Sequence, residues 1–135
     1  MCPDANIPCV QLSLVNNLQS EQHIRIGKAL ADLRKDNVLV IGSGFSFHNL
    51  KAFFAPSTQQ SQAMNQAFEH WLIDTCSNRQ ITEEEREHRL INWESAPAAR
   101  YCLPEKSTCC RYMFAMALPA QRQKKCLNLK SWGKW

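Results

Sequence analysis

An apolar run at residues 37–44, NVLVIGSG, limits the folds open to this chain more than any other segment. The run has the length of a β-strand, is rich in β-branched side chains and stops at glycine. Successive side chains of a strand point to opposite faces, so a run that is apolar throughout is typical of a strand covered on both sides. The run therefore predicts an α/β fold with a central parallel strand.

The residues before this run complete a strand–helix–strand pattern. In residues 7–14, IPCVQLSL, apolar and polar side chains alternate, which predicts a strand with one buried face. Residues 20–36 predict a helix with Ser20 as its N-cap and with Ile26 and Leu30 on one apolar stripe. Because the links are short, we expect a βαβ unit with a right-handed crossover.

Helical patterns follow the glycines. Between residues 63 and 72, apolar residues recur at helical spacing: Ala63, Ala67, Phe68, Trp71 and Leu72. The sequence TEEE predicts a capping box, with Thr82 as N-cap and Glu85 at the third helical position, followed by a charged helix. Residues 94–104, ESAPAARYCLP, predict a loop because two prolines interrupt them.

Composition limits the compartment and the class of protein. The chain has 135 residues, which suits one domain with one core. No apolar run approaches the length of a membrane span and the N-terminus has no basic-then-apolar signal pattern, so we expect a cytoplasmic protein without a membrane partner. The seven cysteines are odd in number and include no C-x-x-C pair. We therefore expect reduced thiols, and neither a disulfide framework nor a zinc knuckle.

The net charge of +4 hides a division of the chain at residue 105. Residues 1–105 contain all twelve acidic residues and nine basic ones, which gives a net charge of −3. Residues 106–135 contain seven basic residues and no acidic residue, which gives +7. So abrupt a change indicates that two unlike segments meet at this point.

His48 lies a few residues beyond the predicted central strand. In open α/β sheets, ligands bind outside the carboxyl ends of the strands, and Gly42 and Gly44 would let the backbone turn tightly and approach a ligand. An imidazole there can exchange protons near neutral pH or bind a metal. Equally, His48 could only cap the helix that starts near Asn49, and position alone leaves both interpretations open. A dinucleotide-binding motif is disfavoured, because Phe47 stands where its third glycine should be.

The other three histidines indicate no site. His23 and His88 lie among charged residues of the predicted helices, and we expect both to be solvated. His70 lies between Glu69 and Trp71 and suits either a solvated or a packed position. A lone histidine on a helix is more often structural than a ligand.

Three segments carry a family resemblance: PDANIPCVQLSL at residues 3–14, IGSGFSFHNL at residues 41–50 and APAAR at residues 96–100. In this order they resemble the carboxyl-terminal half of the LigB-type extradiol ring-cleavage dioxygenases, above all the 4,5-DOPA dioxygenase extradiol family. Over residues 1–105, the resemblance implies a partial three-layer α/β fold whose central, mostly parallel sheet is flanked by helices. It implies an oxidoreductase that opens a catechol- or DOPA-type ring with dioxygen, using non-haem Fe(II) or, in some members, Zn(II).

The resemblance also assigns roles to single residues. His48 matches the active-site histidine of the motif G-x-G-x-x-x-H-N-L, which implies a general acid/base role toward the substrate. In some metal-bound members the matching histidine is close enough to serve as a further metal ligand. Gly42, Ser43 and Gly44 would shape the turn, and Asn49 would hold the start of the next helix. This places Ser43, Gly44 and Asn49 beside the substrate.

The resemblance begins midway through the family's sequence. The family places two metal-binding histidines in an amino-terminal half that has no counterpart from Met1 onward. Since non-haem iron needs about three protein ligands, His48 alone cannot hold it. We therefore expect a chain that is truncated, binds metal poorly and is inactive alone. Sheet surfaces that the missing half would cover would then be exposed, which predicts self-association.

Residues 106–135 depart from the family, which continues with a segment like EHLLPL, whose histidine reaches the metal. With the codons taken one frame over, residues 107–117 allow His-Leu-Leu-Pro-Leu-His-Val-Cys-Tyr-Gly, which is family-like. We therefore expect the tail to be translated out of frame, and the nucleotide sequence tests this. Translation out of frame accounts for the cysteines, lysines and tryptophans of this segment without assigning them a function. We therefore favour this explanation over a nucleic-acid-binding arm.

Three functions thus remain to be compared: an incomplete dioxygenase chain, a non-catalytic fragment or module that pairs with another chain, and a nucleic-acid binder. Oxygen uptake with ferrous iron and a catechol separates the first two. Salt-dependent retention on DNA that is lost when residues 106–135 are deleted would favour the third.

Overall fold

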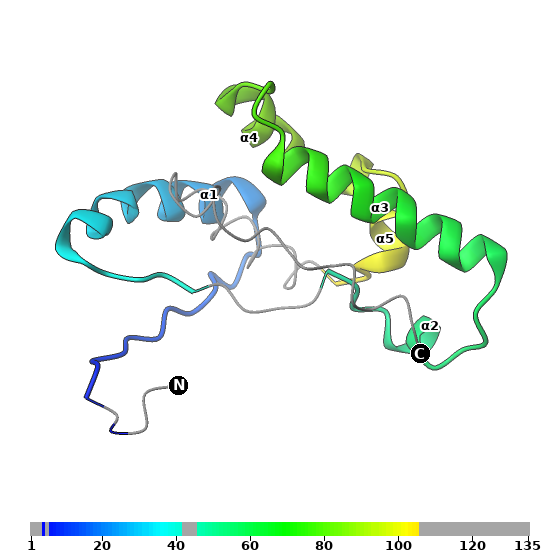
Figure 1. Ribbon diagram of the computed structural model, residues 1–135, viewed down its shortest axis with the longest axis horizontal. Helices are drawn as coiled ribbons and strands as arrows, with labels where there is room; N and C mark the ends of the chain where they lie inside the picture. Colours follow the sequence, from blue (N-terminus) through cyan, green and yellow to red (C-terminus); the bar gives the residue numbers. More distant parts are fainter. Residues whose placement is uncertain (1–3, 5, 42–45, 106–135) are drawn as a thin grey trace.

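The computed structural model describes residues 4, 6–41 and 46–105, and every regular element in this part of the chain is a helix. Figure 1 shows α1 on one side and the longer α3 on the other, with α4 at the end of α3 that is nearer to α1. The elements are α1 (Ser20–Ala29), η1 (Ala31–Asp36), α2 (Leu50–Phe53), α3 (Gln59–Ser77), α4 (Glu83–Ile91), η2 (Trp93–Ser95) and α5 (Ala99–Cys102), where η denotes a 3₁₀ helix. Among them there is no helix that is both long and apolar enough to cross a bilayer.

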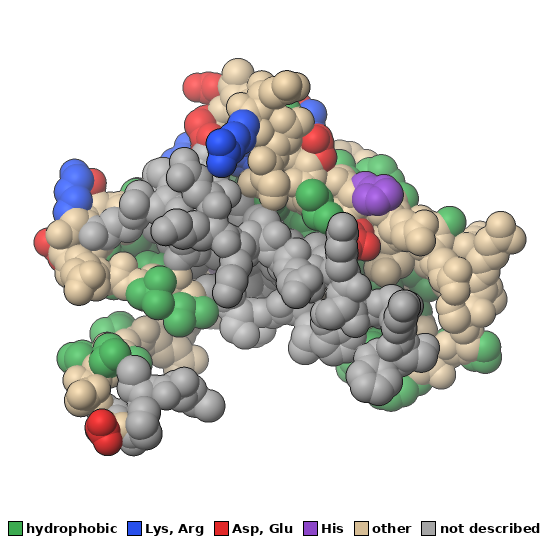
Figure 2. Space-filling model, viewed as in Figure 1, with side chains coloured by type: hydrophobic (Ala, Val, Ile, Leu, Met, Phe, Trp, Pro, Cys, Tyr) green, Lys and Arg blue, Asp and Glu red, His purple; other side chains and the backbone are tan. Residues whose placement is uncertain are grey.

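The predicted α/β fold with a central, mostly parallel sheet is wrong for the described residues, which contain no strand. Residues 7–14, one predicted strand, have no regular secondary structure, and neither do residues 38–41 of the other predicted strand, residues 37–44. Residues 42–44 of that strand lie outside the described residues. The apolar side chains of the two described segments reach solvent: Val10 is 96% exposed and Leu39 78% exposed. Figure 2 shows hydrophobic side chains on the surface of the N-terminal segment.

The failure of the predicted sheet has a physical cause. A pattern of apolar residues reports which side chains favour burial, whereas a strand also needs a neighbouring strand to satisfy its backbone N–H and C=O groups. Within the described part of the chain, neither apolar segment has such a neighbour. The predicted βαβ unit therefore fails together with the sheet, and only its helical crossover is present.

The helix predicted for residues 20–36 is confirmed as two consecutive pieces, α1 and η1. α1 begins at Ser20, but its N-cap is Gln19, whose side chain makes no capping hydrogen bond. The backbone N–H of Gln19 donates to the side-chain oxygen of Asn17 at 3.1 Å, which fixes the approach to the helix. At Leu30 α1 ends, and the chain continues as the tighter η1.

His23 is buried, with 1% of its surface exposed, so the expectation of a solvated side chain was wrong. Its Nε2 accepts a hydrogen bond from the Val15 N–H at 3.1 Å, and its Nδ1 lies 2.6 Å from the Gln19 carbonyl oxygen. Because a carbonyl can only accept, Nδ1 carries the hydrogen, and the ring is the neutral tautomer. The ring thus fastens the segment before α1 to the first turn of that helix. With Ile24 and Gly27 it forms the buried face of α1.

α3 and α4 confirm the two helices predicted downstream, and their caps differ from the prediction in detail. Thr58 and Ser61 form a capping box at α3, with backbone-to-side-chain hydrogen bonds of 2.9 and 3.1 Å. At α4, Thr82 is the N-cap as predicted and accepts from the Glu85 N–H at 3.2 Å. The Glu85 carboxylate instead accepts from Arg89 at 2.7 Å. The capping box of α3 was not predicted because serine, instead of Glu or Gln, stands at its third helical position.

Residues 94–104 are not the predicted loop, because most of them belong to η2 and α5. Pro97 lies in the turn between these elements, where Ala98 has a φ of 55°, and Pro104 follows the end of α5. The prolines therefore mark the ends of two short helices rather than an irregular segment. Pattern-based analysis missed both helices because each is about one turn long.

A small apolar core lies where these helices meet. α3 packs against α4 and α5, α1 packs against α4, and η2 packs against α5. Phe68 and Trp71 stack on α3 with ring centres 5.7 Å apart. The buried apolar residues are Ile24, Phe68, Leu72, Cys76, Leu90, Trp93, Ala96, Ala99, Cys102 and Leu103. The short α5 thus contributes Ala99 and Cys102 to the core, and its C-cap Leu103 is buried as well.

Arg86 joins α3 to α4 from a buried position, with 6% of its surface exposed. Its guanidinium donates to the backbone carbonyl of Thr75, and to that of Asn78 at 2.8 Å. Both carbonyls lie at the C-terminal end of α3, where they lack partners within the helix and where the helix dipole favours a cation. The Glu83 carboxylate lies 3.7 Å from Nε and adds partial charge compensation.

We expect Arg86→Met to lower the free energy of unfolding by about 2–3 kcal/mol, because the buried Thr75 carbonyl and the part-buried Asn78 carbonyl lose a charged donor. Chemical denaturation of the full chain measures this value. Arg89→Met is the matched control one turn away: Arg89 pairs with Asp74 and Glu85 at the surface, so we expect a loss below about 1 kcal/mol. Equal losses for the two variants would contradict the role given to Arg86.

Candidate functional site

The side chain of His48, the predicted catalytic residue, is exposed immediately before α2. Its backbone N–H donates a 2.8 Å hydrogen bond to the carbonyl oxygen of Cys102, the last residue of α5. No hydrogen bond or ion pair to the His48 ring occurs among the described residues. The structure therefore fixes the backbone of His48 and leaves its imidazole available to a ligand.

Asn49 makes two hydrogen bonds with the two ends of its side-chain amide. Its Oδ1 accepts from the Ala52 N–H at 3.0 Å, so Asn49 is the N-cap of α2, as the family resemblance implied. Its Nδ2 donates to the Tyr101 carbonyl oxygen at 2.8 Å. Beside them, the rings of Phe47 and Tyr101 meet edge to face with centres 6.0 Å apart. Residues 47–49 are thus held against α5 by two hydrogen bonds and one aromatic contact.

These contacts bring together two of the sequence motifs, IGSGFSFHNL and APAAR. The second motif opens α5, and α5 supplies both carbonyls that hold residues 48 and 49. The last four carbonyls of a helix lack partners within it, so the end of α5 offers acceptors that a nearby chain can use. The sequence order of the motifs did not show this contact, because they lie on different elements.

Arg100 stabilises α5 from outside. Its guanidinium lies over the ring of Trp93 at 5.1 Å and pairs with the Glu94 carboxylate at 2.6 Å. It also donates to the Pro104 carbonyl at 3.2 Å. Since the Trp93 side chain is almost wholly buried, Arg100 ties the surface of α5 to the core. Its place in the APAAR motif was the only sequence signal for this role.

The Cys102 thiol is not a reactive group. The side chain is fully buried, and burial raises the pKa of the thiol to about 11. A neutral thiol is a poor nucleophile and a poor metal ligand at neutral pH. Cys102 therefore serves the site through its backbone carbonyl and the core through its side chain.

The structure leaves several predicted residues untested or away from His48. Gly42, Ser43 and Gly44 lie outside the described residues, so their roles in the turn and in substrate binding stay predictions. His70 on α3 and His88 on α4 are exposed, in agreement with a solvated position for His88.

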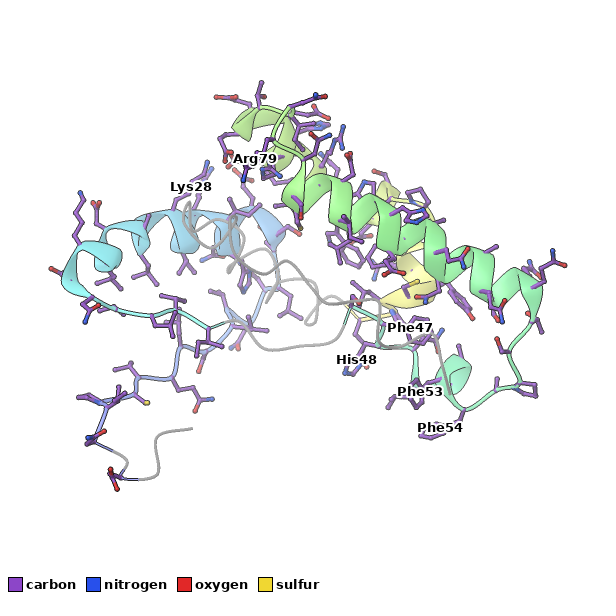
Figure 3. All side chains as sticks on the ribbon, viewed as in Figure 1. Lys28, Phe47, His48, Phe53, Phe54 and Arg79 are labelled. Carbon is purple, nitrogen blue, oxygen red and sulfur yellow. The ribbon has the colours of Figure 1, made fainter. Side chains whose placement is uncertain are left out.

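Exposed aromatic side chains lie next to His48 in the chain, at the end of α2. Phe53 is 57% exposed and Phe54 81% exposed, and their rings meet edge to face at 5.2 Å. In the view of Figure 3, His48, Phe53 and Phe54 lie in the same region, around the short α2. Two exposed aromatic rings therefore follow the exposed imidazole closely in the chain.

The described residues do not form a complete metal site. Among them, no group of three His, Cys, Asp or Glu side chains is placed to hold one ion. His48 could supply one ligand, whereas a non-haem iron site uses about three protein ligands.

Comparison with known proteins supplies the family. A protein-family model, described as the catalytic LigB subunit of aromatic ring-opening dioxygenase, matches residues 1–132. The match extends past residue 105, the last residue to which the sequence motifs carried the resemblance. The dioxygenase tasH of Hapsidospora irregularis is 32% identical over 114 residues, which cover 77% of this chain and 33% of that protein. The 4,5-DOPA dioxygenase extradiol of Beta vulgaris is 34% identical over 97 residues, which cover 71% of this chain and 36% of that protein.

The chain thus spans about a third of the length of these relatives. No solved structure matches it. The family model covers nearly all of the sequence, and the chain belongs to the LigB family of extradiol aromatic ring-opening dioxygenases, which are oxidoreductases.

Proposed function

We propose that this chain supplies the acid/base histidine of a dioxygenase that opens a catechol- or DOPA-type ring with dioxygen. The observation that carries the proposal is the exposed His48 ring on a backbone that is fixed to α5. Ring opening requires that a substrate hydroxyl lose its proton and that a proton be returned later. An imidazole can do both near neutral pH, and a fixed backbone keeps it within reach.

Family membership implies a non-haem metal, and we propose iron(II) or zinc(II) for it. Because the described residues do not fit a complete metal site, we derive only the part that His48 takes in the reaction. We also propose a cytoplasmic location. The sequence has an odd number of cysteines and no C-x-x-C pair, which suits a reducing compartment without a disulfide framework.

The role of His48 is testable in a chimera in which residues 3–105 replace the matching segment of the Beta vulgaris relative. We expect the chimera to consume oxygen with a catechol and ferrous iron. His48→Gln should lower kcat by about 100-fold, because it removes a proton-transfer group. His88→Gln, which changes an exposed histidine on α4, should leave kcat within about twofold.

The full chain alone, assayed in the same way, should consume no more oxygen than free ferrous iron does. A folded chimera in which His48→Gln keeps the full kcat would contradict the proposed role of His48. Circular dichroism of each variant establishes that the chimera is folded.

A second candidate function, a module that pairs with another chain or with itself, has its own support. Several large apolar side chains are exposed: Val10 at 96%, Leu39 at 78%, Ile41 at 77% and Phe54 at 81%. Exposed apolar surface of this extent marks an association surface or an aggregation hazard. We propose that the chain self-associates through residues 7–14 and 38–41.

Sedimentation of the full chain over a range of concentrations tests this second function. We expect concentration-dependent association that Val10→Lys weakens by about tenfold, since burying a valine side chain contributes about 1.5 kcal/mol or more. Gln66→Lys adds the same charge at an exposed position on α3, outside both segments, and should leave association nearly unchanged. A chain that stays monomeric at every concentration would refute the proposal.

The role of residues 106–135 remains a proposal, because the segment lies outside the described residues. Translation out of frame predicts that the alternative frame of the gene encodes the family-like text. If that frame encodes no such text, the basic segment becomes a candidate for nucleic-acid binding.

A further inference from the structure

We propose that Asn49 is a positioning residue for His48, acting through the hydrogen bond from its Nδ2 to the Tyr101 carbonyl. The last turn of α5 supplies the carbonyls of Tyr101 and Cys102 that accept hydrogen bonds from residues 49 and 48, and we call this turn the seat. The inference rests on the proposed function, since positioning matters only if the His48 ring takes part in the reaction. It differs from the substrate-binding role that the family resemblance implied for Asn49.

Hydrogen bonds at two adjacent residues fix the orientation of the segment, which a single hydrogen bond would leave free to rotate. The His48 N–H donates to the Cys102 carbonyl, and the Asn49 side chain donates to the Tyr101 carbonyl, each at 2.8 Å. With the first bond alone, the segment could pivot about it, and the Cα–Cβ bond of His48 would turn as well. The second bond removes this freedom. Because misplacing a reacting group by about 1 Å can cost about 100-fold in rate, such a constraint serves catalysis.

The seat is itself well fixed. The N–H of Leu103 donates to the Ala99 carbonyl at 2.7 Å, and that of Cys102 donates to the Ala98 carbonyl at 3.0 Å. Ala99, Cys102 and Leu103 are buried in the core, and Arg100 holds the outer side of α5 on Trp93. The carbonyls of Tyr101 and Cys102 therefore project from a rigid turn.

The two hydrogen bonds of Asn49 have separable purposes. The acceptor Oδ1 caps α2, which any good N-cap residue can do, whereas the donor Nδ2 reaches across to α5. Asn49 is half-buried, so its amide is held between the two elements rather than turned fully to solvent. Serine would keep the capping acceptor and lose the Nδ2 group that reaches the Tyr101 carbonyl, and alanine would lose both groups. This difference makes the positioning role testable apart from the capping role.

The experiment measures amide hydrogen exchange in the full chain by NMR, with neither metal nor substrate present. In Asn49→Ser, we expect the His48 amide to exchange about fivefold to tenfold faster, because the segment loses one of its two hydrogen bonds to α5. The Ala52 amide, which reports the cap, should keep its protection to within about twofold. In Asn49→Ala both amides should exchange faster.

Thr58→Ala is the matched control, because it removes the cap of α3 and leaves the seat intact. It should leave exchange at His48 unchanged. Unchanged exchange at His48 in Asn49→Ser would overturn the inference. So would equal acceleration at His48 and Ala52, since Asn49 would then act only as a cap. Because the measurement needs no turnover, it can fail while the proposed function stands, and loss of activity in His48→Gln can fail while the positioning stands.

Discussion

The hydrogen bond between the His48 amide and the Cys102 carbonyl is the contact on which the candidate site depends. It joins a segment that has little burial of its own to a helix that is part of the core. The Asn49–Tyr101 hydrogen bond and the Phe47–Tyr101 contact hold the neighbouring residues, and this bond holds the backbone of His48 itself. With it, the position of His48 is set by α5, and the position of α5 is set by Trp93, Arg100 and the packing on α3.

The site is therefore built from backbone acceptors more than from side chains. α5 offers the carbonyls of its last turn, and these remain whichever side chains the turn carries. The demand on side-chain chemistry falls on Asn49, which must donate toward α5 and accept from α2. The same device recurs elsewhere in the fold. Arg86 uses carbonyls at the end of α3, and His23 uses the Gln19 carbonyl at the start of α1 and the Val15 N–H in the segment before it.

The sequence predicted the elements that depend on local pattern and failed where pairing or burial decides. The helices around residues 63–72 and 82–91 were predictable, because an amphipathic helix satisfies its own backbone. The two strands were not, because a strand depends on a neighbour that no single segment encodes. His23 was misjudged because its charged neighbours in the sequence are not its neighbours in space. α5 was missed because its flanking prolines resemble those of a loop.

For the candidate site, the order of the family motifs predicted a catalytic His48, which stays a prediction, and placed Asn49 at the start of the next helix, where it is the N-cap of α2. It did not show that α5 holds them, because a contact between residues far apart in the chain leaves no mark in either motif. Arg86 shows the same limit: within a charged helix only its burial separates it from Arg89. Hydrogen bonds to backbone atoms place few demands on the partner's side chain, which is why the pattern of residue types cannot reveal them.

The central claim, that α5 holds His48 by its backbone, is open to direct measurement by the scalar coupling across a hydrogen bond. In the ¹³C- and ¹⁵N-labelled full chain, we predict a coupling between the amide nitrogen of His48 and the carbonyl carbon of Cys102. The coupling between Leu103 nitrogen and Ala99 carbonyl carbon, within the same turn, serves as the internal reference. If the reference is observed and the His48 nitrogen couples to no carbonyl of α5, the account of this site is wrong.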